Sequence, residues 1–399
     1  MKSWQKNLYT IWVAELIAIM GWGVIQPFLP YFIQDLGVTD LAQVELYSGL
    51  ALTVHALAMT ISAPFWGVLA DRYGRKIMVE RSLISGAILY FLMSFVQDVP
   101  SLLLIRFLTG VLTGTVAAAT TLVASSAPRE RVGYALGMLQ MAIYVGALLG
   151  PLMGGVIADA WGYRAAMQVT GGLWLFTTLL VHFMVHEEFQ PVSRKEDAGG
   201  SWGGLRLVLA SSVLMSIFVV RFLTRTGDRV MLPVMSLFIQ SLLEPGAPVA
   251  SITGLVTGAA AGASAVGAVL LGRVSDRFGS RNVLLVCVLA AAVAYVPHFF
   301  VADVWQLTAL QLVVNFFLGG TLTTVSTLLA GLAPDGRQGA VYGLDTSAAS
   351  LGNAVGPMLG AGIAITLGIR SGFLFVAGFF FVAAVAVARL VPKSSAPAK

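Results

Sequence analysis

Long apolar stretches alternate with short polar ones along the whole chain. A helix needs about 20 apolar residues to cross a bilayer core of ~30 Å. Stretches of that kind lie near residues 8–33, 46–69, 77–97, 101–125, 134–158, 165–186, 211–240, 250–271, 282–301, 305–331, 339–363 and 370–390. The pattern predicts an all-α membrane protein with twelve transmembrane helices.

The two halves of the chain repeat each other at an offset of 205 to 206 residues. The matched positions include Gly21/Gly227, Pro27/Pro233, Gly67/Gly272, Asp71/Asp276, Gly74/Gly279, Pro128/Pro334, Arg131/Arg337, Gly150/Gly356, Pro151/Pro357 and Gly154/Gly360. Two halves with the same order of spans predict two pseudo-symmetric bundles that rock around a site between them, as in transporters. We expect a six-helix bundle over 1–186, a flexible cytoplasmic linker over 187–206 and a second six-helix bundle over 207–399.

Charge is scarce and unevenly placed. Charged residues make up 11% of the chain and mean hydropathy is +0.86, against about 25% charged residues in soluble domains. The chain has 24 basic residues. If the N-terminus is inside, only two of them, Arg164 and Arg370, lie in the outer loops. This bias predicts cytoplasmic termini. It leaves no basic face for nucleic acid.

The chain ends and reactive residues exclude several classes of protein. The first span follows Lys2 and Lys6 but is longer than a signal peptide's apolar region, carries Glu15 and has no small-residue cleavage site, so we expect it to stay as helix 1. The single cysteine, Cys287, allows neither a disulfide nor a cysteine-based metal site. No phosphate-binding loop, nucleophile elbow or HExxH is present, so we expect no enzyme activity, cofactor or metal.

A glycine-framed charge cluster follows the second span. Gly67 and Gly74 allow a tight turn and close approach of helices, and Asp71 is followed by the basic residues Arg72, Arg75 and Lys76. Such a cluster can form or break as helix ends part. The alternative is a basic anchor without a switching role, although an anchor needs neither the aspartate nor the glycines.

A ladder of small residues follows in the fifth span. Gly146, Gly150 and Gly154 recur every four residues, and Pro151 bends the helix. Such a face lets helices pack closely in lipid, and span 8 offers a matching surface that includes Gly254 and Gly258. The ladder therefore predicts either a gate between these spans or packing alone.

Charges inside the spans are costly unless they are paired or wet. Seven stand out, namely Glu15, Arg106, Arg221, Arg225, Asp228, Arg229 and Asp345. Arg221, Arg225, Asp228 and Arg229 share one stripe of span 7, and we expect a Glu15–Arg221 bridge across the cavity in one gating state. A structural network without ligand contact is the alternative. For proton coupling we expect Glu15 first, then Asp345 and Asp228, with Arg106 paired to a carboxylate or a substrate.

These motifs together resemble the major facilitator superfamily, and its twelve-span bacterial drug:proton antiporters in particular. The resemblance rests on Gly67-Val-Leu-Ala-Asp71-Arg72-Tyr-Gly74-Arg75-Lys76, on Arg106-Phe-Leu-Thr-Gly110 and on Gly146-x-x-x-Gly150-Pro151-x-x-Gly154-Gly155. It implies that spans 1, 4, 7 and 10 line the cavity and that the span 5 contact seals the outer gate. Aromatic and amide residues on the expected cavity face are Trp22, Gln26, Tyr31, Phe107, Gln311, Asn315 and Phe316.

Three functions remain open on the sequence. The first is a proton-driven exporter of amphipathic drugs or metabolites, acting as a monomer in the bacterial cytoplasmic membrane among its lipids. The second is a transporter or flippase for an anionic or zwitterionic metabolite or lipid-like substrate, because the span 7 arginines suit a carboxylate or phosphate. The third is a membrane sensor that kept the fold and lost transport.

Overall fold

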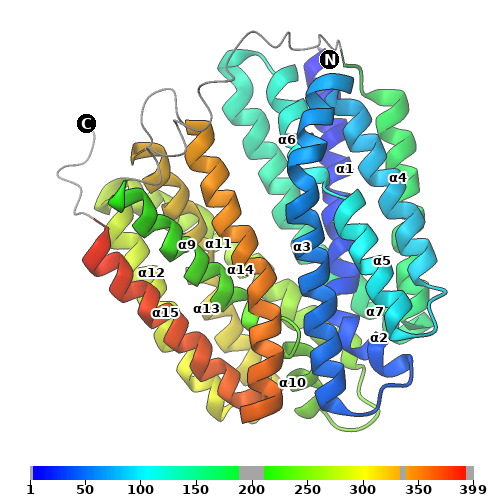
Figure 1. The fold of residues 1–399 in the computed structure, drawn as a ribbon, viewed down its shortest axis with the longest axis vertical. Coiled ribbons are helices and arrows are strands. Elements are labelled where there is room, and N and C mark those ends of the chain that lie inside the picture. The colour runs from blue at the N-terminus through cyan, green and yellow to red at the C-terminus, as the bar shows by residue number, and fades with distance from the viewer. Residues whose placement is uncertain (1–2, 188–210, 333–337, 392–399) are drawn as a thin grey trace. The chain divides into compact units, whose positions relative to one another are not determined.

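The structure is a computed structural model that describes residues 3–187, 211–332 and 338–391. These residues form helices joined by short turns, with no strand among them (Figure 1). The helices of the first half are α1 Ser3–Ile25, η1 Gln26–Phe28, α2 Leu29–Asp35, α3 Leu41–Tyr73, α4 Arg75–Met93, α5 Val99–Leu112, α6 Thr115–Ser126, η2 Arg129–Arg131 and α7 Val132–Met184. Those of the second half are α9 Ser212–Val230, α10 Met235–Ser241, α11 Val249–Phe278, α12 Ser280–Tyr295, η3 Val296–Phe300, α13 Val304–Leu332, α14 Gln338–Leu367 and α15 Ile369–Leu390.

Each of the twelve predicted spans falls mainly on helix, with breaks inside the fourth and the seventh. By length and apolar composition alone, 9 helical segments of the described chain qualify as membrane spans. One of them, Val132–Met184, contains two predicted spans joined at Gly162, whose φ of +86° interrupts the helix. The two remaining spans, α4 and α9, each carry four charged residues. Because of these charges, they do not qualify as membrane spans by apolar composition alone.

The contacts divide the chain into two compact units. Unit 1 is Met1–Ser193 with Glu244–Gly258, and unit 2 is Arg194–Leu243 with Ala259–Lys399. The main difference from the predicted domains is the segment Glu244–Gly258, which packs with the first half although the repeat assigns it to the second. Apart from Glu187, the predicted linker lies outside the described residues.

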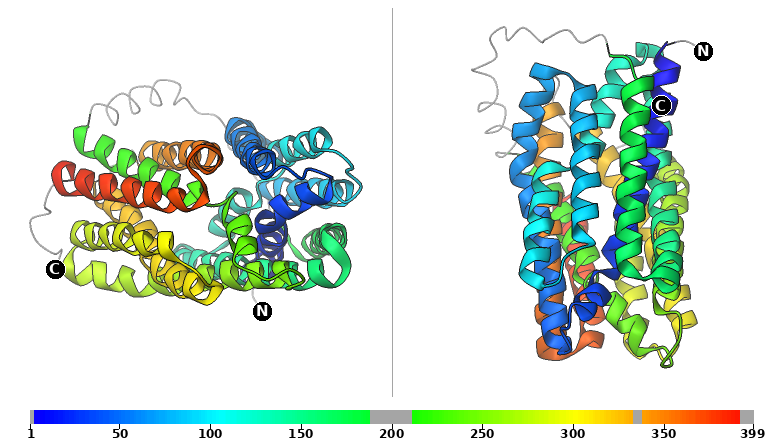
Figure 2. Two further views of the ribbon diagram at one scale, coloured as in Figure 1. Left: turned by 90° about the horizontal axis from the view of Figure 1, so that it is seen from below. Right: turned by 90° about the vertical axis from the view of Figure 1, so that its right-hand side faces the viewer.

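Each unit repeats the same helix pairs. In unit 1, α1 packs along α7, α4 packs on α7, and α4 contacts α5. In unit 2, α9 packs along α14, α12 on α15, and α12 on α13. The views in Figure 2 show the long helices of each unit side by side. The repeated sequence thus builds a repeated packing scheme, as expected for two pseudo-symmetric bundles.

A left-handed glycine closes the same turn in both repeats. Gly74 joins α3 to α4 with φ +103°, and Gly279 joins α11 to α12 with φ +83°. Each donates its backbone N–H to the carbonyl four residues earlier, that of Ala70 or Ser275. A residue with a Cβ is strained in this conformation, so the tight turn predicted at Gly74 is present. At Gly67 no atom of the described residues lies within 4 Å of an added Cβ, so the expected close approach of helices at Gly67 stays a prediction.

Candidate functional site

Glu15 lies in the interior of unit 1 with an uncharged partner. Its side chain on α1 is 1% exposed. The Thr115 hydroxyl donates to Glu15 Oε1 across 3.5 Å, a long hydrogen bond. Among the described residues no cation lies within ion-pair distance of this carboxylate. The carboxyl group is therefore buried, with one neutral hydrogen-bond donor beside it.

A break in the fourth span brings Thr115 to this position. The sequence predicts one continuous helix over 101–125, but the structure ends α5 at Leu112 and starts α6 at Thr115. Gly114 between them has φ +136°. The sequence Thr113-Gly114-Thr115 was the signal from which a helix break could have been predicted. The last two carbonyls of α5, those of Val111 and Leu112, accept hydrogen bonds from Trp66 Nε1 at 2.6 Å and from Arg81 Nη1 at 2.8 Å. The Arg81 guanidinium also lies 3.5 Å from the centroid of the Trp66 ring. Side chains of α3 and α4 thus satisfy the carbonyls that the break exposes.

Arg106 is fully buried on α5. None of its guanidinium nitrogens has a hydrogen-bond partner among the described residues. His55 Nδ1 lies 3.3 Å from the Arg106 carbonyl and 3.2 Å from the Thr109 hydroxyl, so His55 is a packing histidine bound to α5. The carboxylate partner expected for Arg106 is not present in the described part of unit 1. A buried cation without acceptors is costly, which marks Arg106 as a group suited to bind an anion.

The span 7 charges form an ion network inside unit 2. Arg221 Nε lies 3.1 Å from Asp345 Oδ1 on α14. Asp228 Oδ2 lies 3.5 Å from Arg225 Nη1 and 3.6 Å from Arg229 Nε. Asp345 is thus the described partner of Arg221 within unit 2. The Glu15–Arg221 bridge expected in one gating state would join the two units and stays a prediction. Three guanidinium groups face two carboxylates, so the network keeps a positive excess of one charge.

Glycines on α14 bring this network together. A Cβ at Gly352 would lie 2.8 Å from the Cβ of Arg225, and one at Gly356 would lie 2.5 Å from the Cβ of Arg229. Arg229 Nε also donates to Asn353 Oδ1 at 3.1 Å. The close approach of α14 to α9 therefore fixes the arginine stems, and the sequence alone did not identify Asn353 as a partner.

The expected amide and aromatic residues divide between the units. Gln26 and Trp22 lie on η1 and α1 in unit 1, with Gln26 buried. Gln311 and Asn315 lie on α13 in unit 2, where Asn315 Nδ2 donates to both the backbone carbonyl and the side-chain oxygen of Gln311 at 2.9 Å. Tyr31, in contrast, hydrogen-bonds Thr253 through their hydroxyls at 2.7 Å. The Gln311–Asn315 pair is thus a preformed polar contact on one helix, whereas Tyr31 has a structural role.

The glycine ladder of α7 faces α1. A Cβ at Gly146 would lie 2.8 Å from the Leu16 carbonyl oxygen, one at Gly150 would lie 2.5 Å from that of Met20, and one at Gly154 would lie 2.8 Å from that of Val24. The interpretation that this ladder meets span 8 is therefore wrong for Gly146, Gly150 and Gly154. The nearest backbone atoms to each of the three belong to the first helix.

A different face of α7 meets the start of α11. A Cβ at Gly155 would clash with the Ala250 carbonyl, and one at Gly254 would clash with the Pro151 carbonyl. Asp159 accepts hydrogen bonds from the backbone N–H groups of Ala250 at 3.2 Å and Ser251 at 2.7 Å. The Asp159 carboxylate thus caps the positive end of α11, a favourable placement for a negative charge.

The charged loop after the second span is tied to the end of α7. Glu187 accepts hydrogen bonds from the backbone N–H groups of Arg75 at 3.0 Å and Lys76 at 2.7 Å. Lys76 Nζ lies 3.6 Å from Glu80 and donates to the His182 carbonyl at 2.8 Å. The side chain of Asp71 lies outside the described structure, so the predicted Asp71 cluster is untested. Glu187 is the functional candidate that the sequence did not reveal.

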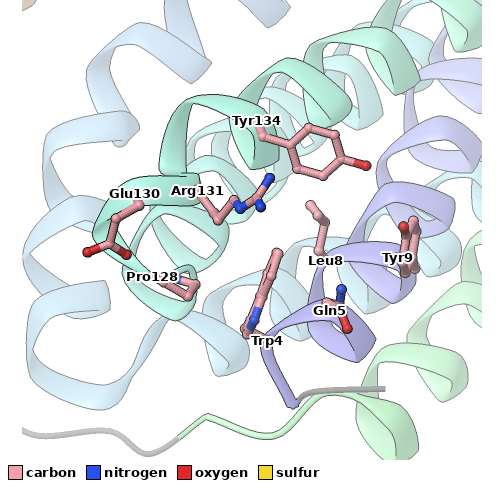
Figure 3. Close-up of a pocket in the computed structure, with 8 residues that line it drawn as sticks. All are labelled: Trp4, Gln5, Leu8, Tyr9, Pro128, Glu130, Arg131 and Tyr134. Atoms are coloured by element: carbon pink, nitrogen blue, oxygen red, sulfur yellow. The ribbon is translucent and has the colours of Figure 1, made fainter.

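A cavity of about 550 Å³ opens between the first turns of α1 and α7 (Figure 3). It is lined by Trp4, Gln5, Leu8, Tyr9, Pro128, Glu130, Arg131 and Tyr134. The Arg131 guanidinium points into the space between Tyr134 and Leu8, whereas the Glu130 carboxylate points away from it. The cavity lies wholly within unit 1.

Comparison with known proteins supplies the family. The Major Facilitator Superfamily matches over residues 11–242 and 217–399. The chain belongs to this superfamily. "Multidrug resistance protein MdtG" of Salmonella dublin is 33% identical over 380 residues, covering 94% of this chain and 93% of that protein, and its Citrobacter koseri namesake is 34% identical over 381 residues, covering 94% and 92%.

Solved structures of this superfamily share the fold. A bacterial homologue of the human lysosomal transporter Spinster, inward-facing and unoccupied, aligns with a TM-score of 0.81 at 16% identity over 100% of both chains. The nucleoside transporter NupG aligns with a TM-score of 0.78 at 14% identity, covering 97% of this chain and all of that one. The protein is therefore an all-α, multi-pass membrane protein of the major facilitator fold, as the sequence motifs indicated. Membership of a transporter family also supports the prediction that it is not an enzyme.

Proposed function

We propose that the protein is a multidrug efflux transporter that exchanges protons for amphipathic molecules by alternating access. The relatives named for multidrug resistance match nearly the whole chain. The structural observation that carries the proposal is Glu15, a buried carboxyl group inside a membrane span whose one partner among the described residues is a hydroxyl. This combination of family and site favours a proton-coupled exporter over the sensor alternative.

Glu15 has the surroundings that a proton site needs. A carboxylate in an apolar interior is costly when charged and unpaired, whereas a protonated carboxyl group needs only hydrogen-bond partners. Opening the site to water, or bringing a guanidinium beside it, reverses that preference. A conformational change that alters the surroundings of Glu15 would therefore bind and release a proton. Asp345 and Asp228 are weaker candidates, because each already faces an arginine.

The proposal includes a gate on α7 distinct from the glycine ladder. The Asp159 cap on α11 and the Tyr31–Thr253 hydrogen bond join the first ten residues of α11 to unit 1. The rest of α11 belongs to unit 2. Rocking of the two halves would break these bonds on one side of the membrane. We assign the sealing contact to this cap and to Gly155 and Gly254.

A second switch is proposed at the loop between α3 and α4. The family motif spans Gly67, Asp71, Arg72, Gly74 and Arg75, and the Glu187 carboxylate binds the backbone N–H groups at its end. Charge contacts at this place can form or break as helix ends move. The basic bias of the loops supports cytoplasmic termini in the bacterial inner membrane, and we propose that the protein acts as a monomer among its lipids.

The test of coupling is Glu15→Gln, because the amide resembles the protonated acid at every pH. In everted vesicles, a fluorescent amphipathic dye should still bind the variant, but uphill transport driven by an imposed pH gradient should stop. Glu45→Gln is the matched control, since Glu45 is also buried at 4% exposure in unit 1 and should retain transport. Gradient-driven transport by Glu15→Gln would move the proton site to Asp345 or Asp228.

A second candidate function is transport of an anionic or zwitterionic substrate. Two observations favour it, namely the positive excess of the Arg221–Arg225–Arg229 network and the unpartnered guanidinium of Arg106. Arginine binds carboxylate and phosphate groups in a two-pronged geometry. Substrate binding would then involve these arginines together with Gln26 and Trp22 of unit 1 and the Gln311–Asn315 pair of unit 2.

A further inference from the structure

We propose that the cavity between α1 and α7 binds the phosphate of an anionic phospholipid through Arg131. This site is separate from the charged and amide residues assigned to transport. The cavity volume of about 550 Å³ is in the range of small-molecule sites. Its lining combines one inward-pointing cation with three aromatic rings and a leucine.

The position of the cavity along the helices matches the boundary between lipid and water. Trp4 is the first residue of the first candidate span, and Val132, which follows Arg131, is the first residue of the α7 span. Tryptophan and tyrosine prefer this boundary because their rings are apolar and their N–H or O–H groups are polar. Trp4, Tyr9 and Tyr134 therefore lie near the depth of the headgroups, with Leu8 one turn of α1 after Trp4.

Charge complementarity selects an anion for the cavity. Among the described residues, no carboxylate lies within ion-pair distance of the Arg131 guanidinium. Figure 3 shows this group pointing into the cavity and the neighbouring Glu130 carboxylate pointing out of it. A guanidinium at a membrane surface that presents anionic lipid is attracted to phosphate and can hold it by two parallel hydrogen bonds.

The second repeat lacks this aromatic frame. At the repeat offset Arg131 corresponds to Arg337 and Leu8 to Leu214. Trp4, Tyr9 and Tyr134 correspond instead to Ala210, Met215 and Ala340. The arginine is thus common to both halves, as expected of a basic loop, whereas the rings occur in the first half alone. Packing shared by the two bundles does not explain the rings, which supports a ligand specific to unit 1.

The test compares lipids of equal chain length but different headgroup. Full-length protein in detergent is titrated with phosphatidylglycerol or phosphatidylcholine, and the melting temperature is followed. We expect phosphatidylglycerol to raise it by several degrees more than phosphatidylcholine does, because a ligand stabilises the state that it binds. Arg131→Gln should weaken phosphatidylglycerol binding by at least about tenfold, and Arg131→Lys should restore part of it. Equal shifts with both lipids, or an unchanged response in Arg131→Gln, would overturn the proposal.

Two further arms identify the source of the phosphate and the place of binding. Arg337→Gln is the matched control, since it removes the repeat's equivalent charge where no aromatic frame exists, and it should keep the full lipid response. Phosphatidylglycerol with brominated acyl chains should quench a tryptophan signal that is absent from Trp4→Phe. If inorganic phosphate or glycerophosphoglycerol alone reproduces the full stabilisation, the site binds a soluble anion and the lipid assignment is wrong. These readouts measure lipid binding and do not depend on whether the protein exports drugs.

Discussion

Replacing Gly150 with alanine should loosen the contact between α1 and α7. An added Cβ would lie 2.5 Å from the carbonyl oxygen of Met20 and 3.0 Å from the Cα of Gly23. Both neighbours are backbone atoms and cannot rotate away. Because ordinary contact starts near 3.4 Å, the two helices would have to separate by about 0.9 Å at this level. Separation of the helices would also weaken the contacts that Gly146 and Gly154 make with α1.

The expected cost is about 1–3 kcal/mol, the usual range for overpacking a well-packed interface. Alanine's better helix propensity opposes this loss by up to about 1 kcal/mol, so a matched control is needed. Gly172 lies on the same helical element, is exposed, and has no atom within 4 Å of an added Cβ. Gly172→Ala therefore reports the propensity gain without the clash. The difference between the two variants should equal the overpacking cost.

Thermal unfolding followed by circular dichroism measures that difference. At roughly 2–4 °C per kcal/mol for a unit of about this size, Gly150→Ala should melt several degrees below Gly172→Ala. Equal melting temperatures, or a higher one for Gly150→Ala, would show that the ladder does not hold the helices in close contact.

Three other substitutions test separate parts of the structure. Asp345→Asn removes the carboxylate from a buried ion pair and should cost about 3 kcal/mol; a thiol-reactive dye should then label the chain's single buried cysteine at a lower temperature than in the unaltered protein. Asp159→Asn removes the negative charge from the start of α11, so a cysteine placed at Ile252 in a Cys287→Ala background should react faster with a membrane-impermeant maleimide; an unchanged rate would remove Asp159 from the gate. Arg225→Ala leaves Asp228 less compensated and should weaken anionic ligands more than tenfold while sparing cationic ones; equal losses would make the network structural.

The helices, the repeat and the buried charges could be predicted because each can be recognised directly in the order of the residues. Apolar length marks a span, and a charge within it stands out by contrast. The pairing of side chains on different helices cannot be recognised in this way. Asp345 lies more than a hundred residues from Arg221 and was known only as a separate intramembrane charge, so its pairing required the close packing of α14 on α9. The break after Leu112 was missed for a related reason, since Trp66 and Arg81 stabilise it from other helices.

The repeat separates packing from function at the glycine ladders. Gly146, Gly150 and Gly154 on α7 press against backbone of α1, and their counterparts Gly352, Gly356 and Gly360 on α14 press against α9. A feature that both halves use in the same way serves the bundle that both halves share. Where the halves differ, symmetry offers no such explanation: Glu15 corresponds to Arg221, and Arg106 to Leu312. The buried charges at those unequal positions are therefore the stronger candidates for proton and substrate binding, while the ladders hold α1 and α9, the helices that carry Glu15 and Arg221, against α7 and α14.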